Sequence, residues 1–317
     1  MSISMSMVCC SHSPLLLGSL EPADREARDG FFKGMKSAGE WLRSCDPELL
    51  VVFGPDHFTG LFYDMMPAFC IGAAATASRD WDLPPGELNV PGQVALDCHR
   101  FVSDAGFDPA ISYRLTVDHG TTIPLHELVG AVDAYPVLPI VVNCVAVTRP
   151  SFRRVREFGA AVGRFLRDLD RRVVIIGSGG LSHDPPTPRL DMRSPEVVAR
   201  LVDRHVATKQ DFDARQARVV TAARALVAGG GPCLPPNEAW DRAFLDRLLQ
   251  QDLEAFDAYT DKMMDREAGF GGHEVRTWVA AAAAMQAAGP FEMTLDYYRI
   301  IPEWITWMAV VRGTAAR

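Results

Sequence analysis

One arrangement occurs four times in this chain and limits the folds that it can adopt. Each time, an apolar segment of strand-like composition runs into a short loop that carries a histidine. The four pairs are Met5–Cys10 with His12, 49–53 with His57, 111–117 with His119, and 174–176 with His183. Short apolar runs rich in β-branched residues are typical of buried strands. Open α/β sheets bind their ligands at the carboxyl ends of such strands, so we expect these histidines at a functional site.

Helical patterns alternate with the strand-like segments. Apolar residues at helical spacing predict helices over about 21–42, 93–105, 124–132 and 150–169. Further strands are predicted over 62–72, 111–115 and Val137–Val142, and the proline-rich stretch 78–92 is interpreted as a surface loop or lid. This alternation predicts an α/β fold: a central, largely parallel or mixed sheet with helices on both faces.

The last third of the chain has a different character. Residues 195–288 follow helical patterns with a break at 229–236, so we expect a helical C-terminal part. The aromatic and apolar segment 297–311 is interpreted as an edge strand of the same sheet. Because no linker separates two self-sufficient cores, residues 1–317 are interpreted as a single domain.

Composition excludes several classes of protein. The chain has 32 Lys and Arg against 40 Asp and Glu, a net charge of -8, and no lysine-rich tract, which argues against a nucleic-acid partner. No apolar run reaches the roughly 18 residues that cross a membrane, and the N-terminus lacks the pattern of a signal peptide. The seven cysteines are odd in number and show no CxxC spacing, so we expect a reduced, cytoplasmic protein.

The histidines and carboxylates indicate a metal site. Two histidines and one carboxylate on one face of an ion form the site of non-haem iron(II) enzymes, which leaves positions open for substrate and dioxygen. Four carboxylates are candidates from the residues alone: Asp56, Asp118, Glu238 and Glu274. Glu274 stands out because it begins an otherwise apolar helix, although the helix dipole also favours an acid there.

The other histidines are interpreted as structural. His99 and His205 each lie beside an arginine in a predicted helix, which indicates a surface position. His126 lies inside a helix and is interpreted as a packing or hydrogen-bonding residue.

The glycine-rich turn 177–180 leaves one alternative open. It is not the GxSxG elbow of serine hydrolases, the GxxxxGK[ST] loop of NTPases or the GxGxxG turn of dinucleotide-binding proteins. His273-Glu274-Val275-Arg276-Thr277 lacks the second histidine of the HExxH motif of zinc proteases. Backbone amides in such a turn can still bind an anion.

With these motifs assembled, the chain resembles the class III extradiol catechol dioxygenases over nearly its whole length. The resemblance depends on the order and spacing of six motifs. They are Ser11-His12-Ser13-Pro14, Gly54-Pro55-Asp56-His57, Val117-Asp118-His119-Gly120, Gly177-Ser178-Gly179-Gly180-Leu181-Ser182-His183, the segment 273–281 beginning His273-Glu274, and Tyr297-Tyr298-Arg299 with Ile301-Pro302-Glu303-Trp304-Ile305.

The resemblance implies a role for each of five residues. His12, His57 and Glu274 would bind iron(II), while His119 would be the proton donor and His183 the proton acceptor. It also implies that the substrates are dioxygen and a catechol with a propionate side chain, and that the protein is a homo-oligomer. The divergent region 229–236 has no assigned role.

Two assignments around this site stay open. Asp118 is a candidate for orienting His119, which follows it in the chain. The partner of the substrate carboxylate is not identified, because Arg276 would point to a different helix face from Glu274, and Arg299 is equally suited to a surface or salt-bridge role.

Three alternatives to this function remain: an extradiol dioxygenase for another catechol, a zinc-dependent hydrolase using the same histidines, and a non-catalytic protein that binds an anion or nucleotide at the turn 177–180. Metal content and iron-dependent turnover separate them.

Overall fold

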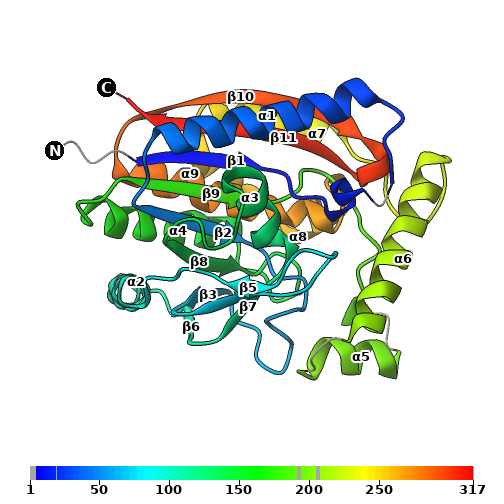
Figure 1. The fold of residues 1–317 in the computed structure, drawn as a ribbon, viewed down its shortest axis with the longest axis horizontal. Coiled ribbons are helices and arrows are strands. Elements are labelled where there is room, and N and C mark those ends of the chain that lie inside the picture. Colours follow the sequence, from blue (N-terminus) through cyan, green and yellow to red (C-terminus); the bar gives the residue numbers. More distant parts are fainter. Residues whose placement is uncertain (1–4, 19, 191–193, 205–207, 317) are drawn as a thin grey trace.

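A mixed sheet of eight strands forms the centre of the molecule (Figure 1). The computed structural model describes residues 5–18, 20–190, 194–204 and 208–316. His205 lies outside the described residues, and so do residues 3–4, with which the sequence predicts that the first strand, 3–10, begins. The strand order is β10-β11-β1-β9-β2-β8-β3-β6. The strands are β1 (Met5–Cys10), β2 (Leu49–Gly54), β3 (Phe69–Gly72), β6 (Ala110–Ser112), β8 (Val137–Val142), β9 (Val173–Ser178), β10 (Phe291–Ile301) and β11 (Thr306–Ala315).

The middle of this sheet is parallel and its flanks are antiparallel. Strands β1, β9, β2 and β8 run in the same direction, whereas β11 is antiparallel to β1 and β3 is antiparallel to β8. A second, small sheet has the order β5-β4-β7 and consists of β4 (Ala75–Ala77), β5 (Gly86–Glu87) and β7 (Leu115–Val117). The expected mixed α/β sheet is therefore confirmed.

Helices cover both faces of the large sheet, as predicted (Figure 1). The helices are α1 (Arg25–Ser44), α2 (Gly92–Asp104), α3 (His119–Val129), α4 (Phe152–Arg167), α5 (Pro195–Val202), α6 (Lys209–Val227), α7 (Glu238–Leu249), α8 (Asp261–Glu267) and α9 (Val275–Ala288). Helices α1 and α3 pack on one face, and α4 and α9 pack on the other. None of the described helices is long and apolar enough to cross a membrane.

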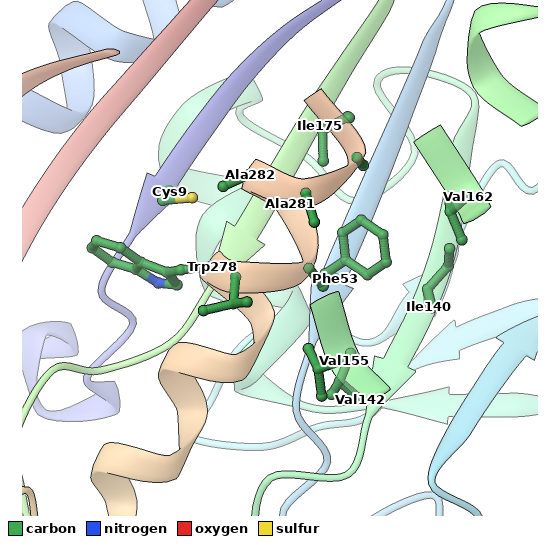
Figure 2. Packing of buried hydrophobic residues seen from close by; sticks show 14 of the residues in the cluster. Cys9, Phe53, Ile140, Val142, Val155, Val162, Ile175, Trp278, Ala281 and Ala282 are labelled. Carbon is green, nitrogen blue, oxygen red and sulfur yellow. The ribbon is translucent and has the colours of Figure 1, made fainter. Parts of the chain in front are cut away.

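Alternation along the strands divides the core into two layers. In β1, Met7 and Cys9 belong to the layer under α4 and α9, while Val8 and Cys10 belong to the layer under α1 and α3. Figure 2 shows part of the first layer, where Cys9 of β1 lies beside Trp278 of α9 and Phe53 of β2 lies near Ala281. A strand buried on both faces needs apolar residues at every position, which explains the continuous apolar runs in the sequence.

Helices α4 and α9 make unusually close contact. A Cβ atom at Gly159 would lie 2.3 Å from the carbonyl oxygen of Ala280, and one at Gly163 would lie 2.1 Å from that of Ala284. Two glycines four residues apart thus let the two backbones touch. Helix α9 packs against both α4 and the sheet. Glu274 lies immediately before α9, so this packing fixes the position of Glu274.

Three sequence-based boundaries are wrong. The segment 111–115 is not one strand, because its residues divide between β6 and β7, which belong to different sheets. Of 62–72, only the last four residues form a strand. The segment 297–311 forms parts of two strands joined by a short 3-10 helix at Pro302–Trp304, with β10 at the edge and β11 inside the sheet. Local propensity does not reveal these pairings, since they depend on distant strands.

Candidate active site

Three histidines from three parallel strands meet one buried carboxylate. The Nε2 atoms of His12, His57 and His183 lie 3.4, 3.1 and 3.7 Å from the nearer carboxylate oxygens of Glu274. These histidines follow β1, β2 and β9, and their side chains are no more than 12% exposed. The carboxyl edge of the sheet thus holds four of the five predicted site residues in direct proximity.

His119, the fifth residue, completes the cluster from another direction. It is the first residue of α3, and its ring stacks on that of His57 with centroids 4.2 Å apart and planes at 19°. It also meets the ring of His12 edge-on at 5.7 Å. The five side chains line one cavity, whose other walls include Leu15, Trp81, Arg215, Val219 and Trp304.

Each histidine of the cluster has a fixed orientation because its Nδ1 atom faces an acceptor. Those acceptors are Ser178 Oγ for His12 at 2.8 Å, the Asp118 carboxylate for His57 at 3.2 Å, the Asp80 carboxylate for His119, and the Leu181 carbonyl for His183 at 2.7 Å. Ser178 donates its own proton to the Gly120 carbonyl, so its oxygen accepts from His12. Each ring therefore turns its Nε2 atom toward the cavity. An Nε2 atom in this position can bind a metal or exchange a proton.

Glu274 is held as an anion. Burial raises its pKa, but the nearby rings of His12 and His183 outweigh burial and hold the pKa well below its usual range. The backbone N–H of Gly180 donates to Oε2 at 2.8 Å, which also stabilises the charge. The glycine turn thus binds an anion, and that anion is a side chain of the protein itself.

His57 lies between two carboxylates. Burial lowers its pKa, but Asp118 on one side and Glu274 on the other raise it to about 10. Without a proton on Nε2, two acceptors would face each other at 3.1 Å, so this position requires a proton or a cation. His12 and His57 each bring an imidazole nitrogen within 3.4 Å of an oxygen of the Glu274 carboxylate, and imidazole nitrogens with a carboxylate are a donor set that divalent transition metals bind. The cluster therefore fits a metal ion.

The described residues contain two further groups of potential ligands. In the first group, ring nitrogens of His12, His57 and His119 lie within 4.8 Å of one another. In the second, carboxylate oxygens of Asp80 and Asp118 and a ring nitrogen of His119 lie within the same distance of one another. The second group is poorly available, because Asp80 and Asp118 already accept hydrogen bonds from histidine Nδ1 atoms and backbone N–H groups. If His12, His57 and His119 alone bound the ion, the negative charge of Glu274 would lie beside the ion without binding it.

Asp80 is a site residue that sequence reasoning missed. The stretch 78–92 is expected to be a surface loop or lid, yet Asp80 and Trp81 are only 1% and 4% exposed. Asp80 contacts His119 Nδ1, so the expectation that Asp118 orients His119 is wrong; the Asp118 side chain contacts His57 instead. Trp81 and Asp82 have φ angles of 56° and 58°, and this turn directs Asp80 inward. No sequence pattern signals such a turn in non-glycine residues.

Two glycines make room for the ring of His183. A Cβ atom at Gly180 would lie 2.5 Å from its Cε1, and one at Gly271 would lie 2.2 Å from its Nε2. Larger residues at either position would displace the imidazole. The absence of a side chain at Gly180 and Gly271 therefore lets the His183 ring occupy its position in the site.

The remaining candidate carboxylates and histidines lie outside the cluster. Asp56 accepts backbone N–H bonds from the loop that follows it, and Glu238 pairs with Arg242 at the surface. His99 is partly exposed, and its Nε2 bonds the Pro109 carbonyl at 3.0 Å. His126 lies in α3 with a buried Nε2 that has no hydrogen-bond partner among the described residues.

The two arginines considered for the substrate carboxylate both have other partners. Arg276 is fully buried and donates to Asp261 and to the Pro150 carbonyl. Arg299 pairs with Glu26, and its side chain is 52% exposed. No described residue of the loop 229–236 lines the cavity.

Comparison with known families gives a match over almost the whole chain. Residues 6–309 match the family described as the catalytic LigB subunit of aromatic ring-opening dioxygenase. The match spans all five residues of the cluster.

Several curated relatives share the name 2,3-dihydroxyphenylpropionate/2,3-dihydroxicinnamic acid 1,2-dioxygenase. The one from Cupriavidus pinatubonensis is 45% identical, covering 98% of this chain and 99% of the relative. The one from Paraburkholderia xenovorans is 48% identical, covering 94% and 93%. A third, from Mycolicibacterium paratuberculosis, is 42% identical, covering 97% and 98%.

A solved structure shares the fold. An uncharacterized protein from Escherichia coli superimposes with a TM-score of 0.52 at 11% identity, covering 97% of this chain and 99% of the other. At that identity the likeness concerns the fold alone.

Proposed function

The chain belongs to the family of the catalytic LigB subunit of aromatic ring-opening dioxygenases, and on that premise we propose that it cleaves 2,3-dihydroxyphenylpropionate. Ring opening beside the diol, on the side of the substituent, would give 2-hydroxy-6-oxonona-2,4-dienedioate. The cinnamate analogue would give the corresponding triene. The names of relatives that are 42–48% identical over nearly the full length support this substrate.

We propose that iron(II) is the metal and that His12, His57 and Glu274 hold it. The supporting observation is the meeting of two Nε2 atoms with one ionised, buried carboxylate. Held by these three residues, iron(II) would supply a Lewis acid for the catechol hydroxyls and a redox-active centre for dioxygen. Two histidines and one carboxylate leave positions open for both substrates.

His183 is proposed to accept the proton of the second catechol hydroxyl. Its Nδ1–H is bound to the Leu181 carbonyl, so Nε2 is the free basic atom on the cavity side. Burial lowers its pKa, but the charge of Glu274 outweighs burial, and the pKa is raised overall. A raised pKa makes His183 a stronger base near neutral pH.

His119 is proposed to donate a proton during ring opening. The Asp80 carboxylate fixes its Nδ1 side, and its stacking on His57 places the ring beside the proposed metal ligands. Separate residues for the two transfers let a base and an acid act on the same substrate without exchanging roles.

The walls of the cavity suit an aromatic ring. Leu15, Trp81, Trp304 and Ile305 supply apolar surface in the cavity that the four histidines and Glu274 also line. A planar catechol would therefore bind with its diol at the histidines and its ring between apolar side chains.

Turnover with iron(II) tests this function. Protein stripped of metal and reconstituted anaerobically with iron(II) should consume one O2 per 2,3-dihydroxyphenylpropionate and form a yellow ring-opened product when air is admitted. The same protein loaded with zinc should give none. No oxygen uptake with iron bound would refute the proposal, and zinc-dependent hydrolysis without oxygen uptake would favour a hydrolase.

We also propose a single-domain, cytoplasmic homo-oligomer. All seven cysteines are free, which fits a reducing compartment. Strand β10 is an eleven-residue edge strand, and long edges are commonly covered by another element or chain. Light scattering after size exclusion measures the oligomeric state, and a monomeric mass would contradict the homo-oligomer.

A further inference from the structure

One arginine enters the cavity that holds the histidine cluster. Arg215 lies on α6, which in Figure 1 stands beyond the carboxyl edge of the central strands. Among the described residues that line the cavity, it is the one arginine or lysine. Its Nη2 donates to the backbone carbonyl of His57 at 3.3 Å, so the guanidinium lies next to a proposed metal ligand.

A second, larger cavity of about 760 Å³ adjoins the first and is rich in arginine. The two cavities share His57, Thr187, Arg215 and Val219 as wall residues. Six arginines and one aspartate line the second: Arg79, Arg114, Arg200, Arg204, Arg215, Arg218 and Asp211. This surplus of positive charge occurs in a chain whose net charge is -8, so the second cavity differs in the sign of its charge from the protein as a whole.

Four of these six arginines have no carboxylate partner among the described residues. Arg200 pairs with Asp211 at 3.7 Å and Arg204 with Asp64 at 2.7 Å. Within the part of the chain that the structure describes, Arg79, Arg114, Arg215 and Arg218 form no ion pair. Cationic side chains that are not neutralised by the protein attract anionic ligands into a cleft.

We propose that Arg215 binds the side-chain carboxylate of the catechol and thereby selects catechols with an anionic substituent. This rests on the proposed function, which places the diol at the histidines. The substituent of the ring would then extend toward the shared wall where Arg215 lies. A guanidinium and a carboxylate form paired, charge-assisted hydrogen bonds, which suit this recognition.

A purely electrostatic role for Arg215 makes a different prediction. Its charge also helps to lower the pKa values of Asp80 and Asp118, the partners of His119 and His57. Loss of that effect would impair the site for every catechol alike. Loss of a carboxylate partner would impair only substrates that carry the carboxylate.

Two substrates of equal chain length separate these roles. The probes are 2,3-dihydroxyphenylpropionate and 3-propylcatechol, which has the same carbon chain without the charge. In Arg215→Gln we expect KM for the first to rise about 10- to 100-fold, with KM for the second within about twofold of the wild type. Arg215→Lys keeps the charge without the paired geometry and should give an intermediate KM.

The matched control is Arg224→Gln, which removes the same charge from an exposed position on the same helix and should change neither KM. Equal losses for both catechols in Arg215→Gln, or no loss for either, would overturn the inference. If Arg215→Gln does not fold, Arg215→Lys decides: an unchanged ratio of the two KM values refutes the role. A wild-type enzyme that cleaves neither catechol refutes the proposed function itself, whereas equal KM values for both refute only the carboxylate site.

Discussion

At the scale of residues, two buried aspartates orient two histidines that have different proposed roles. Asp118 bonds His57, a proposed metal ligand, and Asp80 bonds His119, the proposed proton donor. Both aspartates are 1% exposed, so each carboxylate is shielded from water and contacts its histidine inside the protein. The sequence predicted the histidines because each follows an apolar strand. It did not predict Asp80, whose position depends on how a non-repetitive loop folds against α3.

Replacing Asp118 should weaken metal binding. In Asp118→Asn the His57 ring loses its charged partner, and we expect iron(II) affinity to fall about 10- to 100-fold. Competition with a chelator during anaerobic titration measures the affinity. Asp118 also caps α3, but asparagine caps a helix as well as aspartate does, so the variant should keep this cap. An affinity equal to that of the wild type would remove Asp118 from the site.

Replacing Asp80 should affect turnover and leave the metal in place. In Asp80→Asn we expect an unchanged iron content and a kcat lower by about 10- to 100-fold, because the His119 ring loses the group that orients it. The neighbouring Asp82→Asn, at an exposed position, is the matched control and should retain full turnover. Loss of iron in Asp80→Asn would instead place Asp80 among the groups that hold the metal.

At the scale of elements, the site is supported by two contacts between distant parts of the chain. The turn before His183 is tied to α7, because Ser182 donates its N–H and its hydroxyl to Asp241 at 2.7 and 2.8 Å. Helix α9, which follows Glu274, is held against α4 by Gly159 and Gly163. Helix periodicity predicted α4 closely, and an apolar helix was expected to begin at Glu274, where α9 follows. Neither contact is visible in sequence, since both join segments about 60 or more residues apart.

Asp241 should give the folding free energy a specific pH dependence. Burial raises the pKa of its carboxyl to about 7 in the folded protein, against about 3.9 in an unfolded chain. The folded state therefore binds the proton more tightly, so this contribution is full below about pH 4 and is lost as pH rises through 7. Asp241→Asn removes it.

Urea unfolding of the wild type and Asp241→Asn at pH 5 and pH 8 measures this effect. The stability deficit of the variant should shrink by roughly 2–3 kcal/mol from the lower to the higher pH. Groups other than Asp241 cancel in the difference. A deficit that is the same at both pH values would contradict the raised pKa.

The α4–α9 contact should not tolerate a methyl group. In Gly163→Ala the added Cβ would lie 2.1 Å from the Ala284 carbonyl oxygen, so we expect a net loss of about 1–3 kcal/mol despite the better helix propensity of alanine. Thermal and urea unfolding measure the change. Gly230→Ala, where the nearest atom is 4.0 Å away, should stay within about 0.5 kcal/mol of the wild type. A neutral or stabilising Gly163→Ala would mean that the helices are further apart.

At the scale of the whole molecule, the arrangement of the parallel strands determines where the site lies. Parallel strands β1, β2 and β9 end at the same edge, so three separate strand-to-loop junctions deliver His12, His57 and His183 to one cavity. The sequence predicted this much because buried parallel strands are recognisable as apolar runs. The β10–β11 hairpin and the arginine-lined cavity were not predictable, since they arise from packing between segments far apart in the chain.

The location of the metal tests this account most directly. Crystals of protein reconstituted anaerobically with iron(II) should give one anomalous peak at the iron absorption edge, at bonding distance from Nε2 of His12, Nε2 of His57 and an oxygen of Glu274. Data collected below the edge are the control for other metals. A peak between Asp80, Asp118 and His119, or none at the cluster in iron-loaded active protein, would contradict it.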